Sequence, residues 1–284
     1  MKKLTTMVVM VSVAALLVAG SARATSYSNH ILGRGDVISY YPLDEPAGPV
    51  IPVDNAEGTA AYDGSLVANV ARGTAGPRTA DGWGGLGTAN THYNYTSNGS
   101  IQLTSALQTA INDSSMTFSM MIKLNSTNNQ SRIFENGIGG NNHLMVQHWN
   151  VGGNRIIIGF NDTATSQFFG TNPLNDLQWH HLVVVRDGTD VHNDATVYLD
   201  GTSLAKTGTG GWGDRNSTTP NIASGADGTT QRLNAGIDEV AFFSTALSAS
   251  EVTSLYYAAV VPEPATMALL VLGSLVLLRR RKSA

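Results

Sequence analysis

The feature that most constrains the fold of this chain is an alternating segment between Met116 and Leu124. Side chains two positions apart lie on the same face of an extended strand, so Phe118, Met120 and Ile122 predict one apolar face. Other short segments are rich in β-branched and aromatic residues, which favour strands. These predicted strands cover residues 37–41, 144–149, 155–160, 181–186, 196–199, 203–206 and 237–243.

Turns and one terminal helix complete this pattern. The pair Asp200-Gly201 predicts a tight hairpin turn, and glycine supplies 30 of the 284 residues. Ser248 and Glu251 have the spacing of a capping box, which predicts that a helix begins there. Many short strands, with helix almost only at the end, predict an all-β fold. We expect two antiparallel sheets packed as a sandwich.

The start of the chain predicts a secretory signal peptide. Two lysines precede an apolar stretch over residues 7–19, and Ala22 and Ala24 supply the small residues of an A-x-A cleavage site. We therefore expect residues 1–24 to be removed during export. The mature chain is expected to begin at Thr25.

The last 23 residues form a second unit with three parts. A Pro-Glu-Pro motif precedes an apolar run over residues 265–278, and the chain then becomes strongly basic. At 1.5 Å per residue a helix of this run is about 21 Å long, shorter than a hydrocarbon core of roughly 30 Å. We expect a short transmembrane helix with its basic end in the cytoplasm. The motif and the arginines are Pro262, Glu263, Pro264, Arg279, Arg280 and Arg281.

This order of parts resembles the PEP-CTERM sorting signal. The resemblance implies a Gram-negative bacterium, export, and processing near the Pro-Glu-Pro motif by an exosortase-like membrane enzyme. It also implies transient anchoring in the inner membrane through the C-terminal helix, and then a place on the cell surface or in an extracellular biofilm matrix. A plain C-terminal membrane anchor is the alternative.

The segment between the two ends, residues 25–261, is acidic and has no cysteine. Seven of the 17 Lys and Arg residues and one of the 21 Asp and Glu residues lie in the ends, which leaves 10 against 20 and a net charge of −10. Phosphate binding depends on Lys and Arg, so nucleic acid and anionic lipid are disfavoured as partners. Calcium and neutral or cationic ligands are compatible with this charge. The lack of cysteine excludes disulfides and thiolate metal sites.

Four blocks of this segment resemble a laminin-G-like domain, and they occur in the family order. They read YYPLDE (40–45), WHHLVVVRDG (179–188), ATVYLDG (195–201) and GIDEVAFF (236–243). The family fold is the concanavalin A-like jelly roll, in which two curved antiparallel sheets leave a concave face. The resemblance implies a module that binds glycans or proteins. The predicted organisation is a signal peptide at 1–24, this domain at 25–261 and the sorting signal at 262–284.

Aromatic side chains are the candidates for ligand binding. Exposed rings hold sugars because an apolar ring face packs against a sugar face. Trp83 and Trp212 lie in glycine-rich stretches that predict loops, and a lid over the rim of the core is the alternative for them. The candidate ligand-binding residues are Trp83, Tyr93, Tyr95, Trp149 and Trp212.

No residue is predicted to be catalytic. Related jelly-roll glucanases carry a Glu-x-Asp-x-x-Glu strand, which places carboxyl groups at the spacing that glycoside hydrolysis needs. None of the glutamates in residues 25–261 begins this spacing. His180 and His181 are neighbours on a strand and point to opposite faces, so they do not bind one metal together. The prediction is that the protein is not an enzyme.

A structural calcium ion is predicted from the same resemblance. In concanavalin A-like relatives a calcium often ties the last strand to the N-terminal segment, and Asp238 matches the last-strand aspartate of that pattern. Calcium takes about six to eight oxygen ligands, and Asp54 lies in an oxygen-rich stretch that resembles a turn. Asp44 is the substitute for Asp54. The alternative is that Asp238 only accepts backbone hydrogen bonds at a strand end.

The predicted function is an exported cell-surface or matrix module that binds a glycan, with extracellular polysaccharide as its partner. Adhesion to a surface protein, without a sugar site, is the second hypothesis, and a polysaccharide-active enzyme is the third. Aromatic rings exposed across the concave face would favour the first hypothesis. A covered or apolar face would favour the second, and clustered carboxylates would favour the third.

Overall fold

The two ends of the chain lie outside the part that the structure describes. The computed structural model describes residues 26–45, 53, 56–67, 70–96, 99–111, 115–127, 131–136, 144–149, 155–159, 167–171, 173–188, 195–208, 220–224 and 232–261. Within these ranges, no helix is both long enough and apolar enough to cross a bilayer. The predictions that fall outside them are the signal peptide with Ala22 and Ala24, the membrane helix with Pro262, Glu263, Pro264, Arg279, Arg280 and Arg281, and the side chains of Asp54 and Trp212.

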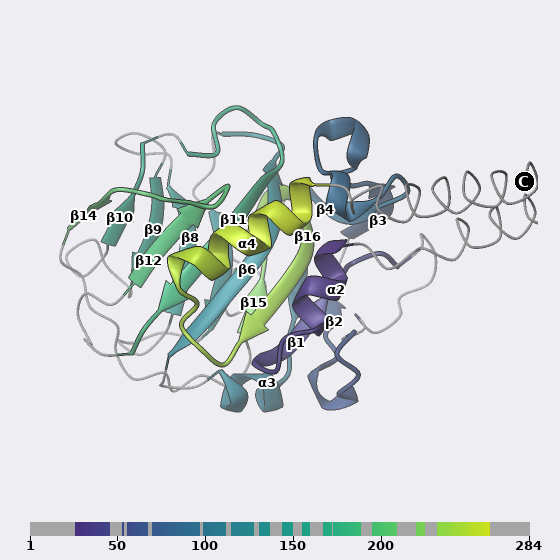
Figure 1. The fold of residues 1–284 in the computed structure, drawn as a ribbon, viewed down its shortest axis with the longest axis horizontal. Coiled ribbons are helices and arrows are strands. Elements are labelled where there is room, and N and C mark those ends of the chain that lie inside the picture. The colour runs from purple at the N-terminus through teal and green to yellow at the C-terminus, as the bar shows by residue number, and fades with distance from the viewer. Residues whose placement is uncertain are drawn as a thin grey trace, which may run out of the picture.

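A first antiparallel sheet is built around two long strands, β6 and β16 (Figure 1). Strand β16 pairs with β6, with β4 and with β1, so strands from the beginning and the end of the chain are neighbours. The strands in spatial order are β13 (Thr202–Ser203), β12 (Ala195–Leu199), β11 (His180–Arg186), β6 (Met116–Leu124), β16 (Asn234–Phe243), β4 (Thr91–Thr96) and β3 (Val70–Ala75), with β1 (Val37–Tyr41) on β16.

A second antiparallel sheet packs against the first. Strands β8 and β9 form the hairpin that the sequence predicts for residues 144–160. The strands in spatial order are β14 (Lys206–Thr207), β10 (Gln167–Phe169), β9 (Arg155–Gly159), β8 (Leu144–Trp149), β7 (Ser131–Asn136), β15 (Pro220–Ile222), β5 (Ser100–Gln102) and β2 (Ser65–Val67).

The main core lies between the two sheets. Phe118 of β6, Phe134 of β7 and Phe242 of β16 form a ring cluster with centroid separations between 5.0 and 5.5 Å. These separations suit favourable aromatic pairs. Met120 and Ile122 lie in the same core, as the alternation predicts. The predicted antiparallel sandwich is therefore confirmed, and its architecture is consistent with a jelly roll.

A helical layer covers the outer face of the first sheet. The helices α2 (Ser26–Leu32) and α4 (Ala249–Val260) pack against each other and against the 3-10 helix η3 (Gly84–Leu86), and Figure 1 shows α4 lying across this sheet. Val252 and Leu255 of α4 and Ile31 of α2 join a second apolar cluster with side chains of β6, β11 and β16. The first sheet is thus buried on both faces, which explains why nearly every residue of β6 and β16 is buried.

Several local predictions need correction. The predicted strand at 203–206 is divided, because β13 pairs with β12 in the first sheet whereas β14 pairs with β10 in the second. The capping box at the start of α4 is confirmed, but helix is not confined to the end of the chain. Helices α2 and α3 (Ser105–Ala110) have only seven and six residues, too few for a clear helical period. The short 3-10 helices η1 (Ala60–Tyr62) and η2 (Thr79–Asp81) were also missed.

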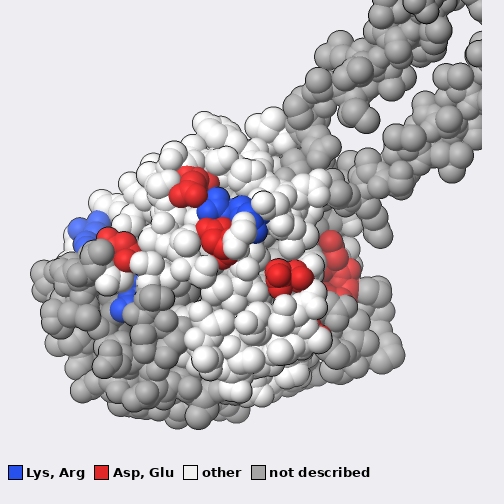
Figure 2. Space-filling model, turned by 60° about the horizontal axis from the view of Figure 1, so that its bottom comes forward, with Lys and Arg blue, Asp and Glu red and all other residues white. Residues whose placement is uncertain are grey.

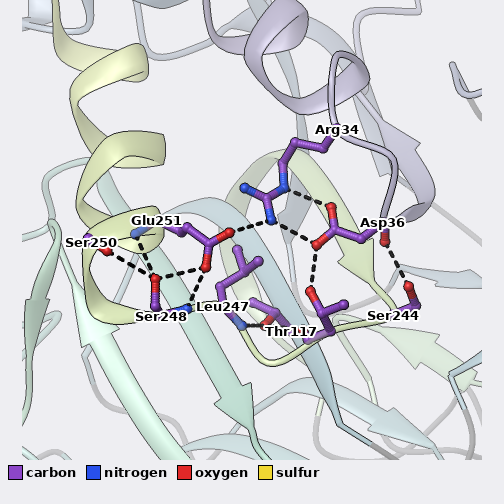
Figure 3. Close-up of polar contacts among 9 residues, drawn as sticks. Arg34, Asp36, Thr117, Ser244, Leu247, Ser248, Ser250 and Glu251 are labelled. Atoms are coloured by element: carbon purple, nitrogen blue, oxygen red, sulfur yellow. Dashed lines mark hydrogen bonds and ion pairs between the residues drawn. The ribbon is translucent and has the colours of Figure 1, made fainter.

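Arg34 connects the end of α2 to the start of α4 (Figure 3). Its guanidinium donates to both carboxylate oxygens of Asp36 at 2.8 and 2.7 Å and to Oε1 of Glu251 at 2.9 Å. Glu251 also accepts from the backbone N–H of Ser248 at 2.8 Å as part of the capping box. The side chain of Glu251 is 42% exposed, so its ion pair adds little to stability, and the apolar contacts between the helices dominate.

Charged side chains are sparse on the surface. Only 13% of the residues are Lys, Arg, Asp or Glu, against about 25% in a typical protein. Figure 2 shows a largely uncharged face with a mixed group of acidic and basic side chains near its centre, a second mixed group at the left and acidic groups at the right.

Candidate functional site

A cavity of about 210 Å³ lies on the outer face of the first sheet, beside the helical layer. One wall comes from the loop between β3 and β4, another from the residues just before β11, and the floor includes a side chain of β6. Two indole rings and four side chains with hydrogen-bonding or charged groups meet there. We call it the tryptophan pocket, and its lining is Ala75, Gly76, Arg78, Asp81, Trp83, Lys123, Gln178 and Trp179.

The first wall is the loop between β3 and β4, which is stabilised by hydrogen bonds within the loop. The N–H of Trp83 donates to the carbonyl of Arg78 at 3.0 Å, and the side chain of Asn90 donates to the carbonyl of Pro77 at 3.0 Å. Gly82 has φ +91° between them, in the left-handed region that glycine adopts without strain. Gly82 therefore permits the tight turn that precedes Trp83.

Trp83 forms one side of the pocket. Its ring meets the ring of Tyr256 on α4 edge to face, with centroids 6.0 Å apart, and the residue is 7% exposed. The sequence predicts an exposed loop tryptophan with a core lid as the alternative. The structure favours the alternative, because Trp83 is buried in the apolar cluster under α4, and it also lines the cavity.

Trp179 also lines the cavity, and it was not among the residues that the sequence predicts to bind a ligand. Its ring meets the ring of His92 at a centroid separation of 4.9 Å. Gly236 lies beneath both rings, and a Cβ at this position would lie 2.8 Å from His92 and 2.8 Å from Trp179. Burial lowers the pKa of His92 to about 4, so this histidine is neutral at pH 7. The rings of Trp179 and His92 therefore form a close-packed and uncharged group beside the pocket.

His180 fixes the residues that precede β11. Its Nε2 lies 2.8 Å from Oδ1 of Asp176, and its Nδ1 lies 2.7 Å from Oδ2 of Asp200. Oδ1 of Asp176 also accepts from the backbone N–H of Gln178 at 3.0 Å. Burial alone would lower the pKa of His180, but hydrogen bonds to Asp200 and Asp176 outweigh it and raise the pKa. The prediction that His180 and His181 have structural roles on opposite faces agrees with this arrangement.

Two of the candidate aromatic residues prove to be core residues. Tyr93 and Tyr95 on β4 have no exposed surface and belong to the main core between the sheets. The prediction that they are exposed is wrong, because their i, i+2 spacing puts both rings on the inner face of β4. Trp149 lies on β8, and its side chain, like Trp212, is outside the described part of the structure.

The second sheet carries a polar group that is closed to solvent. Arg132 donates from Nη1 to Oε1 of Gln147 at 2.7 Å, and its Nε lies 3.2 Å from Oε2 of Glu135. Glu135 is 6% exposed and Gln147 is 1% exposed. These side chains therefore contact one another and are not exposed to a ligand. The tryptophan pocket is the better candidate for a ligand site.

Asp238, the predicted calcium ligand, is fully buried. Its Oδ2 accepts from Asn90 at 2.6 Å, while its Oδ1 has no hydrogen-bond partner among the described residues. Burial, then the charges of Glu239 and Asp44, raises the pKa of Asp238. The described ranges contain no group of three acidic or histidine side chains that would hold a metal, and Asp54 lies outside them. The described residues alone do not make up a calcium site.

The calcium prediction is tested by melting curves. If calcium binds the folded state alone, a hundredfold excess over Kd stabilises that state by about 2.7 kcal/mol. We expect a chelator to lower the melting temperature of the parent protein and to leave Asp238→Asn unchanged. Asp81→Asn, at an exposed site, is the control and should respond as the parent does. Identical curves for the parent with calcium and with chelator would refute the prediction.

The fold defines the class of protein: it is a two-sheet antiparallel sandwich with a helical layer on the outer face of one sheet. Residues 94–253, more than half of the chain, match the family model described as the concanavalin A-like lectin/glucanases superfamily. The chain belongs to this superfamily, and the laminin-G-like resemblance is confirmed. Residues 260–282 match the PEP-CTERM protein-sorting motif, which indicates export and sorting to the cell envelope.

Three solved structures illustrate the likeness in fold. Domain 4 of AbnA, a GH43 extracellular arabinanase from Geobacillus stearothermophilus, in complex with arabinotriose, is 15% identical, with a TM-score of 0.54 over 78% of this chain and 98% of that chain. Trypanosoma rangeli sialidase in complex with sialic acid is 15% identical, with a TM-score of 0.56 over 81% of this chain and 36% of that chain. The receptor binding domain of botulinum neurotoxin C/D mosaic serotype is 15% identical, with a TM-score of 0.52 over 78% of this chain and 51% of that chain. A comparison with curated proteins gives no significant match.

The prediction that the protein is not an enzyme is contradicted by these comparisons. The similar structures include a domain of a GH43 arabinanase and a sialidase, which are glycoside hydrolases. The fold is consistent with a binding role or with an enzymatic role. The prediction rested on the absence of one carboxylate spacing, and the absence of one motif does not exclude an enzyme.

Proposed function

We propose that this protein is an exported module that binds carbohydrate in the tryptophan pocket. The observation that carries the proposal is the pairing of Trp83 and Trp179 in one cavity with Asp81 and Gln178. A sugar presents many hydroxyl groups beside an apolar ring face. The exposed surface of the pocket is mostly polar and can bond the hydroxyl groups, while the two largely buried indole rings leave a small apolar area for the ring face. The cavity of about 210 Å³ equals roughly seven water volumes, which suits one sugar ring.

The sorting motif supports a place of action outside the cytoplasm. The motif matches from residue 260, where helix α4 ends, so the folded domain and the signal adjoin. We propose that an exosortase-type enzyme of a Gram-negative bacterium processes the chain near Pro262, Glu263 and Pro264. The chain is then held only transiently in the inner membrane and reaches the cell surface or the matrix, where polysaccharide is the partner.

Two kinds of variant test carbohydrate binding. Gln178→Ala removes a polar group from the rim, and Trp83→Phe shortens one wall while it keeps an aromatic ring under α4. We expect each variant to bind its glycan about tenfold more weakly, which corresponds to about 1.4 kcal/mol. The exported protein is applied to a glycan array, and the glycans that bind are then titrated by calorimetry.

Ser203→Ala is the matched control for these variants. Ser203 is exposed on β13, at the opposite edge of the first sheet from β3, and it should bind glycans as the parent does. Melting curves establish that every variant is folded. A parent protein that binds no glycan, or pocket variants that bind with parental affinity, would overturn the proposal and would favour adhesion to a protein.

A further inference from the structure

We infer that the tryptophan pocket selects acidic saccharides, whose carboxylate is held by Arg78 and Lys123. This inference rests on the proposed carbohydrate function and names its ligand class. The pocket has two cationic side chains against one carboxylate, Asp81, in a segment whose net charge is −10. The local charge is thus opposite in sign to that of the whole domain.

Arg78 has hydrogen-bonding capacity that the described residues leave unused. Its Nε lies 3.7 Å from Oδ2 of Asp81, beyond hydrogen-bond distance, and this Nε is buried with no acceptor. The two side chains are 37% and 42% exposed, so their attraction is weak. Because this Nε is closed to a ligand, a carboxylate would meet the outer N–H groups of the guanidinium, on a side chain that is partly exposed. The guanidinium presents parallel N–H groups that match a planar carboxylate.

Lys123 supplies the second cation from the floor of the pocket. It lies on β6 opposite Gly236 of β16, and it makes no hydrogen bond or ion pair with the described residues. Its charge is close enough to His92 to help lower the pKa of that histidine, after burial, which is the larger cause. Neutral His92 therefore adds no charge to the wall, and the excess of one positive charge in the pocket matches a singly charged carboxylate.

The experiment compares sugars that differ only in the acidic group. The full exported protein is titrated with galacturonate, with galactose and with galactose 6-sulfate, and binding is followed by tryptophan fluorescence and calorimetry. We expect galacturonate to bind at least tenfold more tightly than galactose, and we expect added salt to reduce this preference. Arg78→Gln and Lys123→Gln should each reduce the preference for galacturonate over galactose, whereas Ser203→Ala, on the exposed strand β13, should keep the parental preference.

The outcomes separate this inference from the proposed function. Binding of galactose and galacturonate with equal affinity would overturn the acidic preference and leave carbohydrate binding in place. Binding of neither sugar, nor of any glycan on the array, would overturn both. Tighter binding of the sulfated sugar than of the uronate would replace carboxylate by sulfate as the recognised group and refute the inference as stated. Asp81→Asn should increase the acidic preference, because it removes the opposing charge, and melting curves exclude misfolding as the cause of any loss.

Discussion

Replacement of Gly236 by alanine is expected to eliminate ligand binding in the tryptophan pocket. The new Cβ would lie 2.8 Å from ring atoms of both His92 and Trp179, closer than real Cβ contacts. Strand β16 cannot shift to relieve this overlap, because it is paired on both sides with β4 and β6. The ring of His92, that of Trp179, or both must therefore move, which disturbs the wall of the pocket. We expect a loss of about 1–3 kcal/mol in stability, typical of overpacking, and a loss of binding of more than tenfold.

Fluorescence spectra, melting curves and glycan titration measure this effect. Gly35→Ala is a matched control, since a Cβ at Gly35 meets nothing within 4 Å. A second variant, Gly236→Ala combined with His92→Ala, removes one of the two overlapping rings and should recover part of the stability. If Gly236→Ala melts and binds as the parent protein does, the packing account of the pocket is wrong.

Acid is expected to destabilise the protein through His181. This histidine is fully buried, and its Nε2 lies 3.0 Å from the hydroxyl of Tyr27 and 2.9 Å from that of Ser119. Its Nδ1 has no partner among the described residues. Burial lowers the pKa of His181 to about 4, while the unfolded chain has the ordinary value of about 6.5.

The sign of the pH dependence of stability follows from the proton affinities of the two states. Between these two pKa values the unfolded state binds the proton more tightly, so stability is retained above about pH 6.5 and is lost as the pH falls toward 4. The slope for one histidine reaches about 1.4 kcal/mol per pH unit. His92 adds a slope of the same sign, and Glu239, whose pKa burial raises to about 8, adds one of the opposite sign. We therefore expect the slope measured by urea unfolding to differ between the parent and His181→Gln by up to the one-histidine amount. A variant with the full parental slope would contradict the assignment to His181.

Local patterns predicted the parts of the fold that depend on neighbouring residues. The alternation from Met116 to Leu124 predicts β6, and the pair Ser248 and Glu251 predicts the start of α4. Helix α2 was missed because its stability depends on distant contacts, such as those of Tyr27 with Ser119 and His181, which lie 92 and 154 positions away in sequence. No local window contains that information.

The candidate site was predicted only in part for the same reason. Trp83 was selected from its glycine-rich loop, but the pocket forms only where that loop meets Trp179 and Lys123, roughly 40 to 100 positions further along the chain. One available signal was overlooked. Tyr93 and Tyr95 alternate with polar residues on β4, and this period of two indicates a core face rather than an exposed pair.

The contact between α2 and α4 also determines how the domain responds to mechanical force. Residue 26 opens α2 and residue 261 follows α4, so a pull on the two ends of the described domain first meets the contact of these helices and the link from Arg34 to Glu251. The next elements inward are β1 and β16, paired antiparallel with Val37 opposite Phe243. The outer ends of these two strands are adjacent, so tension applied there breaks the hydrogen bonds of the pair one after another. When the two ends are pulled apart, the contact between α2 and α4 is therefore expected to separate before the two sheets do.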